Sequence, residues 1–174
     1  MKSSDSEITE ILAKALQLEK NGLKTYLEYA GYTEDKSGKD MFIILARDEF
    51  EHMTIIEKVI EEYSGKSTLV GLNIGKGFSS AILPDLKDID NYRKGGDGTN
   101  QFHALEMALK FESRSRELYL DLAEKAQSVE AESMFLTLAE MEKAHYEILE
   151  AQKNSIAGTG LWIELAGAGM ENLL

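Results

Sequence analysis

Residues 46–53 read ARDEFEHM, and residues 139–146 read AEMEKAHY. In each stretch a glutamate stands three positions before a histidine, as Glu49 with His52 and Glu142 with His145. Side chains three positions apart project from the same face of an α-helix. Each stretch can therefore aim a carboxylate and an imidazole at one point, and together they predict helices that share a single site.

The similarity of the two stretches extends outward at the constant offset of 93 positions that separates Glu49 from Glu142. The same offset relates further matching residues: Glu19 and Glu112, Tyr26 and Tyr119, Ala30 and Ala123, Phe42 and Phe135, and Leu45 and Leu138. Self-similarity at a fixed offset indicates a repeated structural unit. A duplication that preserved only helix packing would keep the apolar positions and vary the polar ones, so the repeated inward glutamates favour a site.

Apolar residues recur at helical spacing in four segments, which predict helices at residues 5–31, 38–63, 100–127 and 129–153. A capping box of Ser4 and Glu7 marks the predicted start of the first helix, and Ser128 is the predicted cap of the last. The chain has 174 residues and one proline. This length and composition predict one all-α domain spanning residues 1–174.

The connection at residues 64–99 contains the only proline and is far longer than an ordinary helix connection, so we expect it to be a crossover. The predicted architecture is a four-helix bundle of two antiparallel helix pairs joined by this crossover. Residues 154–174, which include Trp162, form a predicted tail or short fifth helix. Packing on the bundle or a dimer contact is the expected role of this tail, and we expect a homodimer.

The formal net charge of −12 opposes binding to nucleic acids and to anionic membrane surfaces, because both require a face rich in lysine and arginine. The chain has no cysteine, which excludes disulfides and thiolate metal centres. The N-terminal residues lack the apolar core of a signal peptide, and no apolar run approaches the roughly 18 residues of a membrane span. We therefore expect a cytoplasmic protein.

The repeated glutamates and histidines predict a metal site made of Glu19, Glu49, His52, Glu112, Glu142 and His145. Burying four carboxylates in an apolar bundle is unfavourable because each charge loses its hydration, and two divalent cations would cancel the four charges. Glu49 and Glu142 are the natural bridging ligands, and Glu19 and Glu112 the terminal ones. Mixed carboxylate and imidazole ligands suit iron or manganese, and the lack of thiolates argues against structural zinc.

Two tyrosines and one further histidine are also candidates. Tyr26 and Tyr119 follow the terminal glutamates by two turns on the same helix face, close enough to hydrogen-bond the site or gate a radical, although they could instead only support the ligands or pack in the core. His103 precedes Glu112 by nine residues, which places it on the opposite side of its helix. We expect His103 to lie at the surface.

Around these residues the sequence resembles the ferritin-like di-iron superfamily, and within it the rubrerythrin branch. The resemblance covers residues 8–153 and rests on four motifs: LEKNGLKTY at 18–26, ARDEFEHM at 46–53, FESRSRELY at 111–119 and AEMEKAHYE at 139–147. It implies a ferritin-like bundle that holds two iron ions, with manganese or a mixed pair as alternatives. It also implies an oxidoreductase that reduces hydrogen peroxide or dioxygen.

The sequence departs from the full rubrerythrin pattern in two respects. Full-type rubrerythrins have an additional glutamate one turn after the ligand that matches Glu112, where this chain has Ser115, and Gly22 occupies the matching position of the first repeat. They also carry a cysteine-rich rubredoxin domain, which a chain without cysteine cannot contain. We therefore expect electrons to come from a separate protein such as a rubredoxin.

Two other functions stay open at the level of sequence. The same site could oxidise Fe(II) for iron storage or delivery, as a ferroxidase of the ferritin-like class. The bundle could instead be a metal-free structural or partner-binding protein. Residue spacing alone implies a dimetal site, whereas peroxide reduction follows only from the resemblance.

Overall fold

The computed structural model describes residues 2–64, 99–126 and 128–164 of the chain. These residues form helices α1 (Lys2–Tyr32), α2 (Lys36–Ser64), α4 (Thr99–Lys125) and α5 (Val129–Thr159) and contain no strand. No helix among these residues has the length and apolarity needed to cross a membrane. The predicted all-α class is confirmed.

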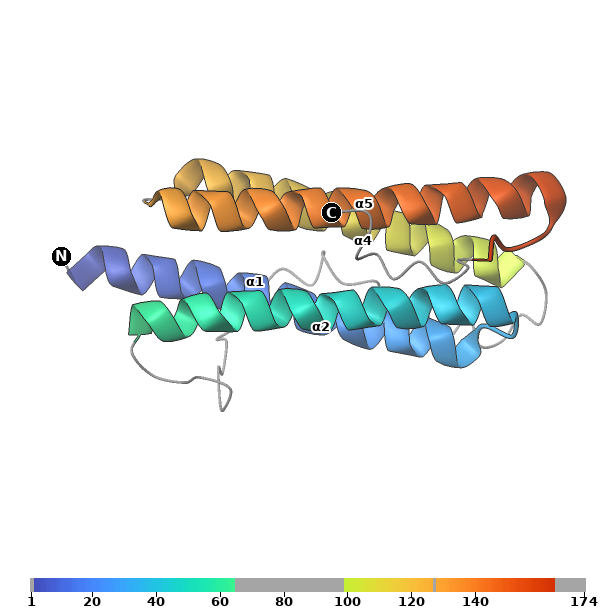
Figure 1. Ribbon diagram of the computed structural model, residues 1–174, viewed down its shortest axis with the longest axis horizontal. Coiled ribbons are helices and arrows are strands. Elements are labelled where there is room, and N and C mark those ends of the chain that lie inside the picture. The colour runs from blue at the N-terminus through green and yellow to red at the C-terminus, as the bar shows by residue number, and fades with distance from the viewer. Residues whose placement is uncertain (1, 65–98, 127, 165–174) are drawn as a thin grey trace.

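The four helices form two antiparallel pairs, α1 with α2 and α4 with α5, which lie side by side (Figure 1). Contacts between the pairs include those of α1 with α4. Helix α2 ends at one end of the bundle, and α4 begins at the opposite end (Figure 1). This arrangement confirms the predicted pair of helix pairs. Most of the predicted crossover, residues 65–98, lies outside the described residues.

The core is built from the faces that the helical periodicity predicts. Buried residues recur at spacings of three and four on every helix, and repeat-related positions are buried alike, as with Phe42 and Phe135 or Leu45 and Leu138. Tyr26 and Tyr119 are among the largest side chains that are completely buried. The two repeats therefore bury matching faces against each other, and their inward polar residues meet inside the bundle.

Helices α1 and α2 differ from their predicted ranges mainly at their starts. Helix α1 begins at Lys2, ahead of the predicted capping box at Ser4. Helix α2 begins at Lys36 instead of residue 38, because the Asp35 carboxylate accepts hydrogen bonds from the backbone N–H groups of Ser37 and Gly38. These bonds satisfy donors that have no partner within the helix. The connection between the two helices is therefore residues 33–35, instead of the 32–37 left between the predicted helices.

The predicted N-cap of α5, Ser128, is confirmed, whereas α4 and α5 both differ from their predicted ranges at their C-terminal ends. The Ser128 hydroxyl accepts a hydrogen bond from the Ala131 N–H, as expected of an N-cap. Helix α4 ends at Lys125, two residues before the predicted end. Helix α5 continues to Thr159, six residues past the predicted end, because Ile156 still packs on the core. Gly160, with φ of 74°, then ends the helix.

After α5 the chain turns back onto the bundle. The Gln152 side chain accepts a hydrogen bond from the Ile163 N–H at 2.9 Å and donates one to the Ile163 carbonyl at 3.0 Å. These bonds hold the half-buried Trp162 against the core. Packing of this segment on the bundle was one of the two expected roles, and residues 165–174 of the predicted tail lie outside the described residues.

Candidate metal centre

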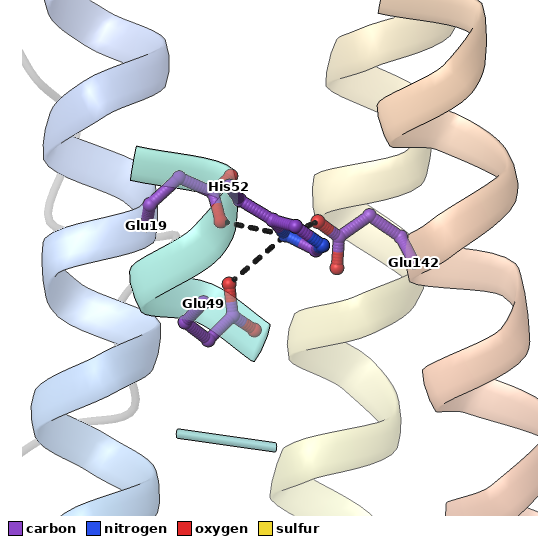
Figure 2. A group of neighbouring side chains, drawn as sticks. All are labelled: Glu19, Glu49, His52 and Glu142. Atoms are coloured by element: carbon purple, nitrogen blue, oxygen red, sulfur yellow. Dashed lines mark hydrogen bonds and ion pairs between the residues drawn. The ribbon is translucent and has the colours of Figure 1, made fainter. Parts of the chain in front are cut away.

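The structure brings all six predicted site residues together between the two helix pairs. Each of the four helices contributes at least one of them, and none of the six is more than 1% exposed. Figure 2 shows Glu19, Glu49, His52 and Glu142 pointing toward one another, with the His52 ring between the carboxylates of the two pairs. The inward direction predicted from helical phase is thus observed for these residues.

The six residues form two overlapping clusters of possible metal ligands. One consists of Glu19, Glu49, His52 and Glu142, and the other of Glu49, Glu112, Glu142 and His145. Within each cluster, one donor atom from every residue lies within 4.8 Å of the others. Glu49 and Glu142 belong to both clusters, which is the position required of bridging carboxylates. His103 is half-buried rather than fully exposed, and it belongs to neither cluster.

The two histidines present the same ring nitrogen to the carboxylates. His52 Nδ1 lies 3.1 Å from Glu19, 3.2 Å from Glu142 and 3.5 Å from Glu49. His145 Nδ1 lies 3.7 Å from both Glu112 and Glu142 and 3.8 Å from Glu49. The two rings stack with their centroids 5.3 Å apart. One imidazole is therefore available to each half of the site.

Burial and mutual repulsion oppose ionisation of the terminal carboxylates when no cation is bound. Burial, followed by the charge of Glu49, raises the pKa of Glu19 well above its ordinary value. Burial and the charge of Glu142 do the same to the pKa of Glu112. A carboxylic acid removed from water keeps its proton unless a positive charge compensates for the lost hydration. Cations would supply that compensation.

The histidines and Glu142 respond to each other in the opposite sense. Burial lowers the pKa of His52 and of His145, but their acidic neighbours outweigh it and the net shift is upward for both. Burial raises the pKa of Glu142, but the neighbouring Glu112, His145 and His52 side chains outweigh it, and the net shift is downward. Without metal, protons on the imidazoles thus provide the positive charge that the carboxylates need.

Several side-chain oxygen and nitrogen atoms that could bind a metal in this site are buried without a hydrogen-bond partner. They include both carboxylate oxygens of Glu49 and of Glu142, Glu112 Oε2 and His145 Nδ1. Leaving such atoms without a partner is costly, and native proteins rarely do so. These atoms come from the residues that form the two clusters. The donor set therefore fits a pair of divalent cations that prefer oxygen and imidazole ligands.

Tyr26 and Tyr119 connect the two helix pairs at the site. The Tyr26 hydroxyl on α1 donates a hydrogen bond to Glu112 on α4, and the Tyr119 hydroxyl on α4 donates one to Glu19 on α1. Both phenol rings are fully buried. Both tyrosines therefore combine a hydrogen bond to the site with packing in the core. Each terminal carboxylate is held by a tyrosine from the other repeat.

Asp48 is a site residue that the sequence reasoning did not identify. It is 7% exposed, and its Oδ2 lies 3.6 Å from Nε2 of His145. A carboxylate on the outer nitrogen of a metal-binding histidine fixes the orientation and the protonated nitrogen of the ring. The repeat could not reveal this residue, because the equivalent position in the second half is Met141. In the sequence, only its position next to Glu49 could have indicated that Asp48 lies near the site.

The two positions that depart from the full rubrerythrin pattern lie against the site. A side-chain carbon added to Gly22 would come within 3.0 Å of both the Glu49 carboxylate carbon and the Phe111 ring. Glycine therefore allows Glu49 to pack closely against α1. Ser115, the repeat-related residue, is 1% exposed, and its hydroxyl has no hydrogen-bond partner among the described residues. Neither residue supplies the additional carboxylate.

This protein is a helical bundle with two overlapping, buried Glu/His clusters. It therefore has the features of the class of four-helix proteins whose interior suits a dimetal site. The chain belongs to the rubrerythrin family, since the Rubrerythrin family model matches residues 10–80 and 103–159. A hypothetical protein from Pyrococcus furiosus has a similar fold, with a TM-score of 0.63 and 21% sequence identity over 86% of this chain and 90% of that chain. No curated protein matches the chain.

Proposed function

We propose that this protein is a non-haem di-iron oxidoreductase that reduces hydrogen peroxide, using electrons from a separate donor protein such as a rubredoxin. The observation that carries the proposal is that two buried four-residue clusters share Glu49 and Glu142. Shared carboxylates would place two ions close enough to act on one small substrate. Membership of the rubrerythrin family supports the same reading.

The proposed ligand roles follow from cluster membership. Glu49 and Glu142 would bridge the ions, and each ion would receive one terminal glutamate and one histidine: Glu19 with His52, and Glu112 with His145. When bound, the two ions supply electrons and Lewis acidity to the oxygen–oxygen bond. If only one iron were bound, Glu49 and Glu142 would have no second ion to bridge to. The reaction should therefore depend on filling both clusters.

The chain's own residues would hold the site in shape and keep bulk water out. Tyr26 and Tyr119 restrain the terminal carboxylates through their hydrogen bonds. Burial, followed by the charge of Glu112, raises the pKa of Tyr26, so its phenol retains its proton at neutral pH. With no cysteine, the chain has no thiolate centre to deliver electrons, which is why the proposal includes a separate donor.

Stopped-flow spectroscopy of anaerobically reduced, iron-loaded protein tests the proposal. The protein is mixed with hydrogen peroxide in one experiment and with dioxygen in another, and oxidation of the iron is followed by absorbance. We expect peroxide to react faster than dioxygen. If peroxide reacts no faster, the peroxidase assignment is abandoned, and if iron-grown protein contains no metal, the dimetal assignment is abandoned as well.

A pair of neighbouring glutamates on α5 provides a matched control. Glu142→Gln removes a proposed bridging carboxylate and should lower the iron content and abolish the rapid peroxide reaction. Glu140→Gln removes the same charge at a side chain that is 64% exposed and should change neither. Equal loss in both variants would show that general charge, rather than the proposed bridge, governs iron binding.

A further inference from the structure

Trp162 is the only tryptophan in the chain, and it is held in a defined place at the end of the bundle. A side-chain carbon added to Gly38 would lie 2.6 Å from the indole ring, so the ring rests directly on the first turn of α2. Its Nε1–H donates a 2.9 Å hydrogen bond to the Gln101 side chain on α4. The half-buried indole thus contacts both helix pairs.

Aromatic rings continue from Trp162 into the metal centre. The Trp162 and Phe42 rings lie 6.0 Å apart between centroids, and the Phe42 and Tyr26 rings lie 6.2 Å apart and nearly parallel. The Tyr26 hydroxyl then donates its hydrogen bond to Glu112. Phe42 and Tyr26 are fully buried. A single series of contacts therefore joins a proposed metal ligand to an indole that reaches solvent.

The second repeat has the inner part of this series without its outer end. Tyr119 donates to Glu19, and its ring stacks on Phe135 at 6.3 Å, which matches the Tyr26–Phe42 pair of the first repeat. In the part of the chain that the structure describes, no tryptophan extends the series beyond Phe135. The repeat itself therefore does not account for Trp162, and among the described residues only the Tyr26 side of the site has a tryptophan at its outer end.

We propose that Trp162 and Tyr26 form a one-electron route between the bundle end and the metal centre, with Phe42 packed between them. The proposal rests on the proposed function, because the peroxide reaction supplies the oxidant. Tryptophan and tyrosine are the side chains here that can lose one electron and regain it, whereas phenylalanine cannot. Electrons would therefore pass between Trp162 and Tyr26 across the Phe42 ring.

The route would complete peroxide reduction when only one electron is available from the metal site. Reducing one peroxide to two waters takes two electrons and two protons. Tyr26 would give the second electron together with its phenolic proton, and the other proton would come from solvent. An electron from Trp162 and a proton from solvent would then restore Tyr26. The indole loses its Nε1 proton to solvent, and a thiol in solution reduces the resulting radical by giving up a hydrogen atom.

Pulse radiolysis of the full-length, iron-loaded protein tests the route without any peroxide chemistry. At neutral pH the azidyl radical oxidises tryptophan faster than tyrosine, so the first radical forms mainly on Trp162, the only tryptophan of the chain. We expect the absorbance of the tryptophan radical to decay as that of a tyrosyl radical appears, at a first-order rate that does not depend on protein concentration. Absence of this conversion in the wild type would overturn the proposal, whatever the stopped-flow reaction with peroxide shows.

Three variants separate the proposed route from its neighbours. Tyr26→Phe should abolish the conversion, whereas Tyr119→Phe, which loses the matching hydrogen bond in the other repeat, should retain it. Tyr29→Phe should also retain it, although the Tyr29 ring lies 5.3 Å from Phe42. Retention in Tyr26→Phe, or loss in Tyr29→Phe alone, would overturn the proposal. Phe42→Leu keeps both oxidisable rings and should slow the conversion, and an unchanged rate would exclude Phe42 from the route.

Discussion

Asp48 illustrates how a single residue can differentiate the two halves of a repeated site. Its carboxylate reaches from α2 to the outer nitrogen of His145 on α5, whereas Met141 occupies the equivalent position in the second repeat. Asp48→Ala should weaken iron binding by about 10–100-fold, because the His145 ring would lose the group that orients it. An anaerobic Fe(II) titration measures this loss.

The other contact of Asp48 provides the control for this prediction. Arg47 donates two hydrogen bonds to Asp48 Oδ1, and Arg47→Gln disrupts that pair without removing the carboxylate near His145. We expect Arg47→Gln to bind iron almost as the wild type does. If both variants lose affinity equally, Asp48 acts through the local helix structure rather than through the imidazole.

Individual residues also show what the sequence could and could not predict. Spacing and repetition identified the six clustered residues, because a glutamate three positions before a histidine projects from the same face of a helix as that histidine. Their role as metal ligands stays a prediction. The role of Asp48 and the contact of Trp162 with Gly38 depend on packing between segments far apart in sequence, which no local pattern predicts.

At the scale of the helices, type and number were predictable, whereas the ends depended on single contacts. Long apolar periodicity and the scarcity of proline identified all four described helices. The start of α2 depends on the Asp35 side chain, and the end of α5 on the packing of Ile156 and the positive φ of Gly160. Tertiary packing overrode the weak helix propensity of residues 154–159.

The first turn of α2 can be tested with a pair of glycine substitutions. Gly38→Ala would force the methyl group into the Trp162 ring, and the free energy of unfolding should fall by about 1–3 kcal/mol because overpacking displaces the indole. Gly31→Ala on α1 meets no atom within 4 Å and should be neutral or stabilising by up to ~1 kcal/mol.

Denaturant unfolding, with the fluorescence of Trp162 as a second signal, measures both glycine variants. In Gly38→Ala the emission should shift as the indole moves toward solvent, while Gly31→Ala should keep the wild-type emission. A Gly38→Ala protein as stable as the wild type, with unchanged emission, would show that the indole can accommodate a methyl group without moving.

For the whole molecule, the buried charges link folding, protons and metal. The raised pKa values of Glu19 and Glu112 stabilise the metal-free fold fully below their ordinary pKa of 4.5, and this contribution is lost as the pH rises through the raised values. The raised pKa values of His52 and His145 likewise stabilise the metal-free fold fully below their ordinary pKa of 6.5, and this contribution is also lost as the pH rises through the raised values. Glu142 acts oppositely, since its lowered pKa adds stability above 4.5 that is lost as the pH falls.

Metal binding should reverse this dependence, because ligands must release their protons to bind a cation. We expect the difference in thermal midpoint between iron-loaded and metal-free protein to widen from pH 6 to pH 8, as proton competition decreases. Circular dichroism melts under anaerobic conditions measure the difference. A gap that narrows toward pH 8 would argue that these glutamates and histidines are not the binding groups.

The reciprocal tyrosine bonds have a consequence for the origin of the fold. Because Tyr26 serves Glu112 and Tyr119 serves Glu19, neither helix hairpin completes its own half of the centre. Two identical hairpins related by a twofold axis would supply the same glutamates, histidines and tyrosines twice. An ancestral hairpin could therefore have formed the whole centre by dimerising. The present chain would then be that dimer fused into one polypeptide, with Asp48 and Trp162 as marks of its later divergence.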